Sequence, residues 1–383
     1  MSKKAKREYL QEIIIRYKNS TKKEKKLILD EFCMNCGYNR KYAIRILNKP
    51  PGMSSSKRKV GRKKVYYTPG IIKFLKDLWS MMNLMCSKRL KEAILLCLPF
   101  YQKSKDKLTE EEVKLLMKIS PATIDRILSS RKGQKSKRGL CTTKPGSMLR
   151  NMIPVKTGQW DESRPGYFEA DTVAHCGGSL EGSYVNTLNL VDIATGWTVQ
   201  RAIWGKGETG VFAALKSIES ILPFRIRGFD SDNGKEFLNY RLYKYFHRRE
   251  KPVEFTRSRA YKKNDNAHIE EKNWTVVRQY LGYERLDKPE LVNMINDLYT
   301  KELYYFINFY KPSLKLKGKI RIGSQVKKLY DKAKPPYTRL METNELSEGQ
   351  KSELMQLKVR LNPYNLRYAI DKKIKIIFKL AAK

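Results

Sequence analysis

The stretch GYFEADTV, residues 166–173, decides the fold. Its side chains alternate, with Phe168 and Ala170 on one face and Glu169, Asp171 and Val173 on the other, which is the period of a β-strand. Two further strand patterns follow, YVNTLNLVDI at residues 184–193 and WTVQRAI at residues 197–203, and a short turn containing glycine joins them. Together the three segments predict an antiparallel meander.

The segments after the meander alternate between helix and strand. Apolar residues at helical spacing predict a helix over residues 208–222 and another over residues 236–248. Strands are expected at residues 224–229 and 253–256, before a last helix that carries Glu270. The resulting order, βββαβαβα, is shared by ribonuclease H-like folds, in which helices cover a mixed five-stranded sheet. The predicted fold class is therefore α/β with a ribonuclease H-like core.

Three acidic residues stand out along these elements. Asp171 lies in the first strand, Asp232 directly follows the fourth in FDSDNG, and Glu270 lies in NDNAHIEEKNW. A helical wheel places Glu270 inside the apolar arc of its helix, an arc that also holds Trp274, and a carboxylate there is costly without a partner. Glu271 falls outside that arc, so the third acid is assigned to Glu270.

Each of these acids taken alone has a simpler explanation. A single Asp at a strand end is more often a cap or turn residue than a metal ligand, and Asp-Asn-Gly is a common turn signal. All three together, on these elements and in this order, favour a functional site.

The runs FEADTV, SDNGKEF and NDNAHIEEKNW resemble the DDE motif of the integrase catalytic core family, which includes retroviral integrases and bacterial insertion-sequence transposases. The likeness covers about residues 160–310, and TKKEKKLILDEFCMNCGYNRKYAIRIL and KLYDKAKPPYTRL also resemble insertion-sequence transposases. The resemblance implies that the first and fourth strands are neighbours, so that the carboxylates of Asp171, Asp232 and Glu270 converge. It further implies cleavage of DNA at element ends to expose 3′-hydroxyls, followed by transesterification into target DNA by a multimer.

Two features separate the chain from retroviral integrases. It has no histidine before His175, so the His-His-Cys-Cys zinc module of those proteins is not expected. The interval between Asp171 and Asp232 is longer than in retroviral cores, and the Gly-rich turn at residues 176–183 accounts for the extra length. The longer interval favours the transposase branch of the family.

Converging carboxylates repel one another and raise each other's pKa unless a cation neutralises them. Mg²⁺ or Mn²⁺, hard ions that prefer oxygen ligands, are the expected cofactors, with two ions in each active site. Two such ions can activate the attacking oxygen and hold the leaving 3′-oxygen in an in-line displacement at phosphorus. Asp171, Asp232 and Glu270 are thus predicted to be both the catalytic residues and the metal ligands.

Asn233, Gly234 and His268 flank these acids in the sequence. Asn233 and Gly234 are expected to let the backbone turn sharply beside the metal, through the free φ of glycine. His268 either contacts DNA or caps the helix, and the sequence does not choose between these roles.

The composition indicates the substrate class. The chain has 79 Lys plus Arg against 39 Asp plus Glu, a formal net charge of +40 over 383 residues. Such an excess implies a polyanionic partner, and nucleic acid is the natural one because neutralising phosphates releases condensed counterions. The expected partner is double-stranded DNA, as terminal inverted repeats and target DNA, bound by a homo-oligomer.

No membrane partner is expected from the sequence. No apolar run approaches the roughly 18 residues that a membrane-spanning helix needs, and the N-terminus MSKKAKREYL lacks a signal-peptide core. A cytoplasmic protein associated with the bacterial nucleoid is the expectation.

Two helical regions precede the expected core. Patterns at residues 9–17, 26–32 and 38–47, interrupted by Gly37, predict either a helix-turn-helix or a plain helical hairpin with solvated charges. Residues 69–129 form a second helical region that closes with ISPATIDRIL, in which Ser120 is the expected N-cap and Pro121 the first helical residue. That segment again resembles the recognition half of a helix-turn-helix.

Basic residues in three places are predicted to contact DNA. They lie on the helix at residues 38–47, in the linker KPPGMSSSKRKVGRKK at residues 49–64, and in the segment before the Glu270 helix. A flexible basic arm can follow phosphates or enter a minor groove, whereas a solvated charge run is the simpler alternative. The predicted DNA-binding residues are Arg40, Lys41, Arg45, Lys57, Arg58, Lys59, Arg62, Lys63, Lys64, Arg257, Arg259, Lys262 and Lys263.

The C-terminal region is basic, and AIDKKIKIIFKL, within residues 361–380, alternates like a strand of a small β-barrel or an edge strand.

The expected division of the chain is 1–50, a helix-turn-helix-like module; 51–68, a basic linker; 69–130, a second helical module; 131–159, another basic linker; 160–312, the catalytic core; and 313–383, a basic C-terminal region with a possible small β-domain.

Two other functions fit the same sequence. A DNA-binding regulator, or a domesticated transposase that has lost its chemistry, would keep the basic modules, although an intact acidic trio argues against it. A ribonuclease H-like nuclease that only hydrolyses would keep the acids but not join strands.

Overall fold

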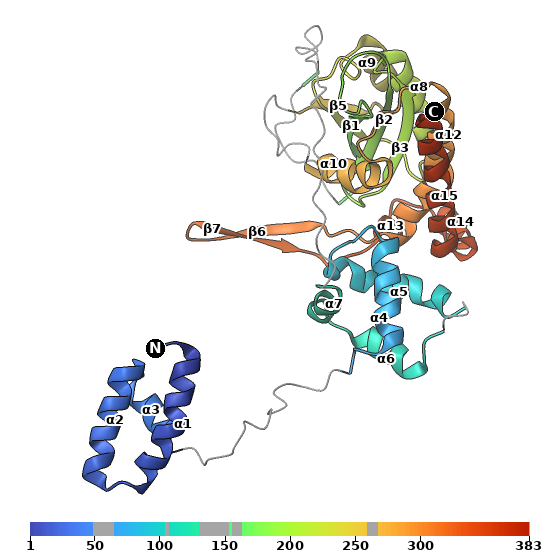
Figure 1. Ribbon diagram of the computed structural model, residues 1–383. Helices are drawn as coiled ribbons and strands as arrows, with labels where there is room; N and C mark the ends of the chain where they lie inside the picture. The colour runs from blue at the N-terminus through green and yellow to red at the C-terminus, as the bar shows by residue number, and fades with distance from the viewer. Residues whose placement is uncertain (49–64, 104–106, 130–152, 155–162, 259–266, 383) are drawn as a thin grey trace. The chain divides into compact units, whose positions relative to one another are not determined.

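A computed structural model describes residues 1–48, 65–103, 107–129, 153–154, 163–258 and 267–382 (Figure 1). The chain divides into two compact units, Met1–Lys64 and Val65–Lys383.

The first unit is a bundle of α1 (Lys3–Asn19), α2 (Lys22–Cys36) and α3 (Arg40–Leu47). Helix α2 begins with a capping box between Thr21 and Glu24 and ends at Gly37, whose φ of 63° is favourable for glycine. Phe32 of α2 and Leu47 of α3 are fully buried between the helices. The three predicted helical segments and the glycine between the last two are confirmed, and a role in reading DNA stays a prediction.

The second unit begins with four helices, α4 (Pro69–Met81), α5 (Ser87–Tyr101), α6 (Glu110–Lys118) and α7 (Pro121–Leu128). The N-terminus of α7 is as predicted, because the Ser120 side chain accepts from the Thr123 amide and Pro121 lies in the first turn. These helices share one hydrophobic cluster with Leu303 and Ile377 from much later in the chain. The second helical region therefore packs directly against the later helices of the same unit.

The second unit contains a five-stranded sheet. It consists of β1 (Tyr167–Ala174), β2 (Val185–Asp192), β3 (Thr198–Trp204), β4 (Gly228–Ser231) and β5 (Glu254–Arg257), in the order β3-β2-β1-β4-β5. The pairs β1–β2 and β2–β3 are antiparallel, whereas β1–β4 and β4–β5 are parallel. This mixed order is that of a ribonuclease H-like core, and the predicted sequence of elements is confirmed.

Helices cover both faces of this sheet (Figure 1). Phe168 and Phe229 pack with residues of α8 (Glu208–Glu219) and α9 (Tyr240–His247). Val185 and Ala202 instead join the cluster formed by the other helices. Those helices include η2 (Asn273–Arg278), α11 (Gln279–Leu281), α12 (Glu290–Leu298), η3 (Tyr299–Leu303) and η4 (Phe306–Tyr310), where η marks a π-helical turn. Helix α10 (Ala267–Lys272) directly precedes η2.

The C-terminal part adds a two-stranded hairpin, β6 (Leu316–Ile322) and β7 (Gln325–Tyr330), and three helices, α13 (Pro336–Met341), α14 (Glu348–Arg360) and α15 (Pro363–Ala381). The strand predicted within residues 361–380 is wrong, because this segment is helix α15. Asn362 caps its N-terminus, and the buried residues Ile370 and Ile377 recur at a helical interval of two turns. The short alternation of Ile and Lys in this segment has the period of a strand, but the residues that are buried in the structure recur with the period of a helix.

Within the described part of the chain, no helix has both the length and the apolar character that crossing a bilayer requires.

Candidate active site

Asp171 and Asp232 lie beside each other on neighbouring strands. Asp171 is in the middle of β1 and Asp232 directly follows β4, and these strands pair in parallel with Ala170 opposite Ser231. Burial, followed by the negative charge of Asp232, raises the pKa of Asp171. The pKa of Asp232 is raised by burial and by the charge of Glu236. The structure thus brings two mutually repelling carboxylates to one point of the sheet.

Two donors fix the carboxylate of Asp171. The Thr172 amide donates to its Oδ1 at 2.7 Å, and Asn273 Nδ2 donates to its Oδ2 at 2.6 Å. Asn273 Oδ1 in turn accepts from Asn189 of β2 at 2.9 Å, and Asn189 accepts from Gln200 of β3 at 3.0 Å. A chain of three amide side chains therefore extends from the edge of the sheet to the acid, and it holds the carboxylate in one orientation.

The loop after β4 shapes the surroundings of Asp232. The Gly234 amide donates to Asp232 Oδ1 at 2.9 Å, and Asn233 Nδ2 donates to the Ser258 carbonyl at 3.0 Å. Gly234 does not have a positive φ, so the expectation that its backbone freedom makes the turn is wrong. Glycine leaves space for the acids, because a Cβ at position 234 would lie 2.9 Å from Asp232 Oδ1 and against the Glu236 carboxylate, so that these side chains would have to shift.

Glu236 is a third carboxylate near the pair, and it was not among the residues predicted from the sequence. Its side chain is buried, accepts from Thr172 Oγ1 at 3.1 Å and pairs with Lys206 Nζ at 3.4 Å. The positive charge of Lys206, from the loop between β3 and α8, lowers the pKa of Asp171 and of Asp232. The sequence signal was the acid two positions after Gly234 in SDNGKEF.

Glu270 lies on α10 and is exposed, whereas its neighbour Ile269 is fully buried. The Ile269 amide donates to Glu169 Oε2 at 3.0 Å, which ties the start of the helix to β1. Glu270 and Asn273 are three residues apart and therefore lie on one helical face. Glu270 is thus one turn before the residue that contacts Asp171, but in the described part of the chain no three His, Cys, Asp or Glu side chains form a metal-binding group.

The helical wheel placed both Glu270 and Trp274 in the buried apolar arc, and this prediction is wrong. Both side chains are exposed, that of Trp274 by 40%. The cause is the π-helical turn η2, which begins at Asn273 and has more residues per turn than an α-helix. Glu271 is exposed, as expected for a residue outside the apolar arc, and its carboxylate lies 3.7 Å from the guanidinium of Arg89 of α5.

The predicted DNA-binding residues within the described ranges lie in two places. On α3, Arg40 pairs with Asp30, Lys41 is exposed, and the Arg45 guanidinium lies 5.1 Å from the centre of the Tyr42 ring. The remaining predicted contacts lie outside the residues that the structure describes: Lys57, Arg58, Lys59, Arg62, Lys63, Lys64, Arg259, Lys262 and Lys263.

The sequence placed Arg257 in the segment before the Glu270 helix. In the structure it is the last residue of β5 and is not part of the following loop. It donates to the Ile153 carbonyl at 3.0 Å and to Asn233 Oδ1 at 3.1 Å. Its guanidinium therefore braces the loop that carries Asp232.

These features define an α/β protein with a ribonuclease H-like core and a half-buried pair of acids, one in β1 and one directly after β4. No family model matches the chain. Its sequence is 40% identical over 340 residues to Uncharacterized protein y4rM of Sinorhizobium fredii, covering 87% of this chain and 94% of y4rM. The chain belongs to the same family as y4rM.

Solved integrase structures are also similar to this chain. The HTLV-2 integrase catalytic core domain in complex with magnesium matches with 14% identity and a TM-score of 0.29, covering 39% of this chain and 90% of that one. The BIV integrase catalytic core domain matches with 14% identity and a TM-score of 0.28, covering 50% and 98%. A simian T-cell lymphotropic virus intasome structure matches with 13% identity and a TM-score of 0.30, covering 51% and 64%. The strand order β3-β2-β1-β4-β5 by itself shows a ribonuclease H-like core.

Proposed function

We propose that this protein is a DDE-type transposase that cleaves DNA to expose 3′-hydroxyl ends and joins those ends to target DNA. The observation that carries the proposal is the pair Asp171 and Asp232, held at adjacent parallel strands. Burial raises the pKa of both carboxyls, and so does a neighbouring negative charge, that of Asp232 for Asp171 and that of Glu236 for Asp232. Like charges held close together in a half-buried site are costly, and they persist where a cation or a reaction requires them. The net charge of +40 supplies affinity for a polyanionic substrate.

The side chains around the pair fit a hard divalent cation such as Mg²⁺ or Mn²⁺. Asp171 and Asp232 offer carboxylate oxygens, which these ions prefer, and an ion would relieve the repulsion that raises their pKa values. Such a cation, when bound, supplies Lewis-acid stabilisation of negative charge at the reacting phosphate. Glu270 would complete the ligand set through a rotation of its exposed side chain or a movement of α10 on binding DNA.

The other residues of the site have supporting roles. Asn273 and the Thr172 amide orient the carboxylate of Asp171, and the Gly234 amide orients that of Asp232. Lys206 and Glu236 form an ion pair next to both acids and set the local charge. In the first reaction a water oxygen attacks phosphorus and the 3′-oxygen leaves with a proton. In the second the freed 3′-hydroxyl attacks a target phosphodiester, so one P–O bond forms as another breaks.

The test is Asp232→Asn in the full chain, assayed on DNA that carries the ends of the mobile element. Asn keeps the size of the side chain but removes the charge that would bind the cation. We expect cleavage and joining to be lost while DNA affinity is retained. Unchanged catalysis in this variant would overturn the assignment.

Joined product separates a transposase from a nuclease that only hydrolyses. The same assay should therefore follow a labelled 3′ end into a longer target-linked strand. Nicks without any joined product, at Mg²⁺ or Mn²⁺ concentrations that support cleavage, would favour the nuclease.

A further inference from the structure

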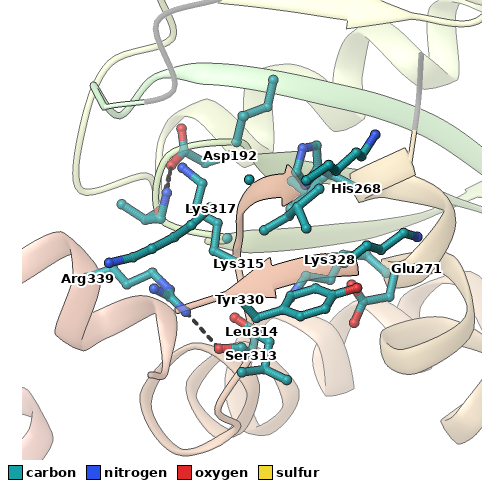
Figure 2. A pocket seen from close by; sticks show the side chains of 18 residues that line it. Asp192, His268, Glu271, Ser313, Leu314, Lys315, Lys317, Lys328, Tyr330 and Arg339 are labelled. Atoms are coloured by element: carbon teal, nitrogen blue, oxygen red, sulfur yellow. Dashed lines mark hydrogen bonds between the residues drawn. The ribbon is translucent and has the colours of Figure 1, made fainter. Parts of the chain in front are cut away.

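A pocket of about 620 Å³ lies beside α10, at the base of the β6–β7 hairpin. Figure 2 shows it lined by His268 and Glu271 of α10 and by Lys328 and Tyr330 of β7. Lys272 also lines it, together with the turn between β2 and β3 and the segment that leads into β6. With 3.6 residues per turn, positions 268, 271 and 272 lie on the face of α10 opposite Glu270 and Asn273. One helix thus separates the pocket from the acid pair.

The floor of the pocket carries a buried cation. Lys272 is 8% exposed, and no hydrogen bond or ion pair of its ammonium is found among the residues that the structure describes. A Cβ at Gly196 would lie 4.0 Å from Lys272 Nζ and 3.6 Å from Ser313 Oγ, so both polar groups reach the floor next to this glycine. A buried ammonium beside a hydroxyl is suited to an anionic oxygen.

The acids in the pocket wall have other partners. Asp192 accepts from the Thr195 amide, the Thr195 hydroxyl and the Gly166 amide at 2.6–2.8 Å. Glu271 faces Arg89. The remaining charged side chains of the wall are cationic, namely Lys315, Lys317, Lys319, Lys328 and Arg339, and of these Arg339 pairs with Asp331. The pocket is therefore strongly positive.

The hairpin extends this positive surface away from the pocket. The 15 residues Leu316–Tyr330 include five Lys or Arg and no Asp or Glu, and all of β7 is exposed. Lys319 and Lys328 lie directly opposite each other across the two strands, an arrangement that is unfavourable without an anion between them. A two-stranded ribbon without a covering layer is also only marginally stable in water, so a bound partner would stabilise it.

We propose that this pocket and the Lys319–Lys328 face of the hairpin hold backbone phosphates of the DNA that enters the acid site. The proposal rests on the proposed function and assigns the position of the DNA relative to α10. The charge complementarity favours a polyanion, and a two-stranded β-ribbon has dimensions that suit a DNA groove. A helix is about 10 Å wide and one DNA strand advances 3.4 Å per nucleotide, so the pocket would bind about three nucleotides from the reacting phosphate.

The first test is the double variant Lys319→Glu and Lys328→Glu in the full chain. The control is Lys372→Glu and Lys375→Glu, two exposed positions of α15 with the same change in net charge. Affinity for a short duplex of mixed sequence is measured against salt concentration in chelator, where no cleavage occurs. The slope of log K against log salt should fall by about two in the hairpin variant and much less in the control. Equal slopes in the two variants would overturn the proposal.

Three further readouts keep the outcomes distinct. Thermal melting checks that the hairpin variant is folded. The substituted side chains are exposed, so its melting temperature should be close to that of the unmodified chain. Unchanged DNA affinity together with a changed oligomeric state in the hairpin variant would identify the ribbon as a contact between protein copies and overturn the proposal. If the hairpin variant has a reduced slope but the unmodified chain does not cleave DNA, the phosphate site stands and the transposase assignment is refuted. If the unmodified chain cleaves DNA but the slope of the hairpin variant is unchanged, the transposase assignment stands and the phosphate site is refuted.

The second test places the phosphate on the DNA. Single methylphosphonate substitutions, which remove one backbone charge, are introduced along the strand on each side of the cleaved bond. Binding by the unmodified chain should be weakened by a substitution about three nucleotides from that bond, and Lys272→Met should be insensitive to it. Equal sensitivity in both proteins would show that Lys272 does not hold that phosphate.

Discussion

Asn273 donates a hydrogen bond of 2.6 Å to the carboxylate of Asp171, and it does so from the first residue of a π-helical turn. The turn places this amide over β1 while Glu270, one helical turn earlier, remains exposed. A π-helical turn inside a helix often accompanies a functional site. Here it brings an uncharged donor to one acid of a repelling pair.

Asn273→Ala should lower DNA cleavage by about ten- to a hundredfold, the usual cost of losing a residue that orients a metal ligand. The physical reason is that Asp171 keeps its charge but loses one of two donors that fix it. Cleavage rate at saturating Mg²⁺ and DNA affinity are the two measurements. Asn189→Ala serves as the graded comparison, because it removes only the support behind Asn273 and should cost less. The reverse ranking of the two variants would contradict this account.

Much of the core followed from local sequence patterns. The alternation in GYFEADTV and the later strand runs predicted five strands in the right order, although the fourth, expected at residues 224–229, lies at Gly228–Ser231. The strand order brings Asp171 and Asp232 together. Such patterns work because the strands are buried in the sheet, and burial is visible in the runs of apolar residues.

The remaining contacts of the site are not visible in such patterns. Glu236 reaches Thr172 and Lys206 through the tertiary fold, so no spacing in the sequence reports these contacts. The π-helical turn shifts the helical period, and the wheel therefore misplaced Glu270 and Trp274. In α15, lysines between isoleucines imitated a strand, whereas the buried residues show a helix.

Replacing Glu236 or Lys206 should move the acidic limb of the pH–rate profile in opposite directions. The charge of Glu236 raises the pKa of Asp232, so Glu236→Gln lowers that pKa and the ionised acid persists to lower pH. Lys206 lowers the pKa of both aspartates, so Lys206→Gln should move the limb to higher pH. Cleavage rates across a pH series measure both shifts. If the acidic limb moved in the same direction in both variants, the charges of Glu236 and Lys206 would not be the cause of the pKa shifts of the two aspartates.

Asp171→Asn should stabilise the fold at neutral and alkaline pH. The pKa of Asp171 is raised above its ordinary value of 3.8, so the folded state binds a proton more readily than the unfolded chain. Stability is therefore lost as pH rises from that ordinary value through the raised pKa, and Asn avoids this loss. At about pH 8 the variant should melt higher, by about 2–4 °C for each kcal/mol gained, and the gain should shrink at about pH 5.

The same melting experiment tests metal binding. Mg²⁺ should raise the melting temperature of the unmodified chain, because a ligand that binds only the folded state stabilises it. The Asp171→Asn variant should show little of this effect. An equal response of both proteins would mean that the ion binds elsewhere.

Gly234→Ala and Gly207→Ala form a matched pair that tests the space around Asp232. A Cβ at position 234 would lie 2.9 Å from Asp232 Oδ1 and closer to the Glu236 carboxylate, so the loop or the two acids must move. At Gly207 no atom lies within 4 Å of the added Cβ, and its φ of −77° suits any residue. We expect Gly234→Ala to lose cleavage at least tenfold, because a displacement near 1 Å at a reacting centre can cost a hundredfold. Gly207→Ala should retain cleavage, and DNA affinity should be unchanged in both. Full activity of Gly234→Ala would show that cleavage does not depend on the position that Asp232 occupies when residue 234 is glycine.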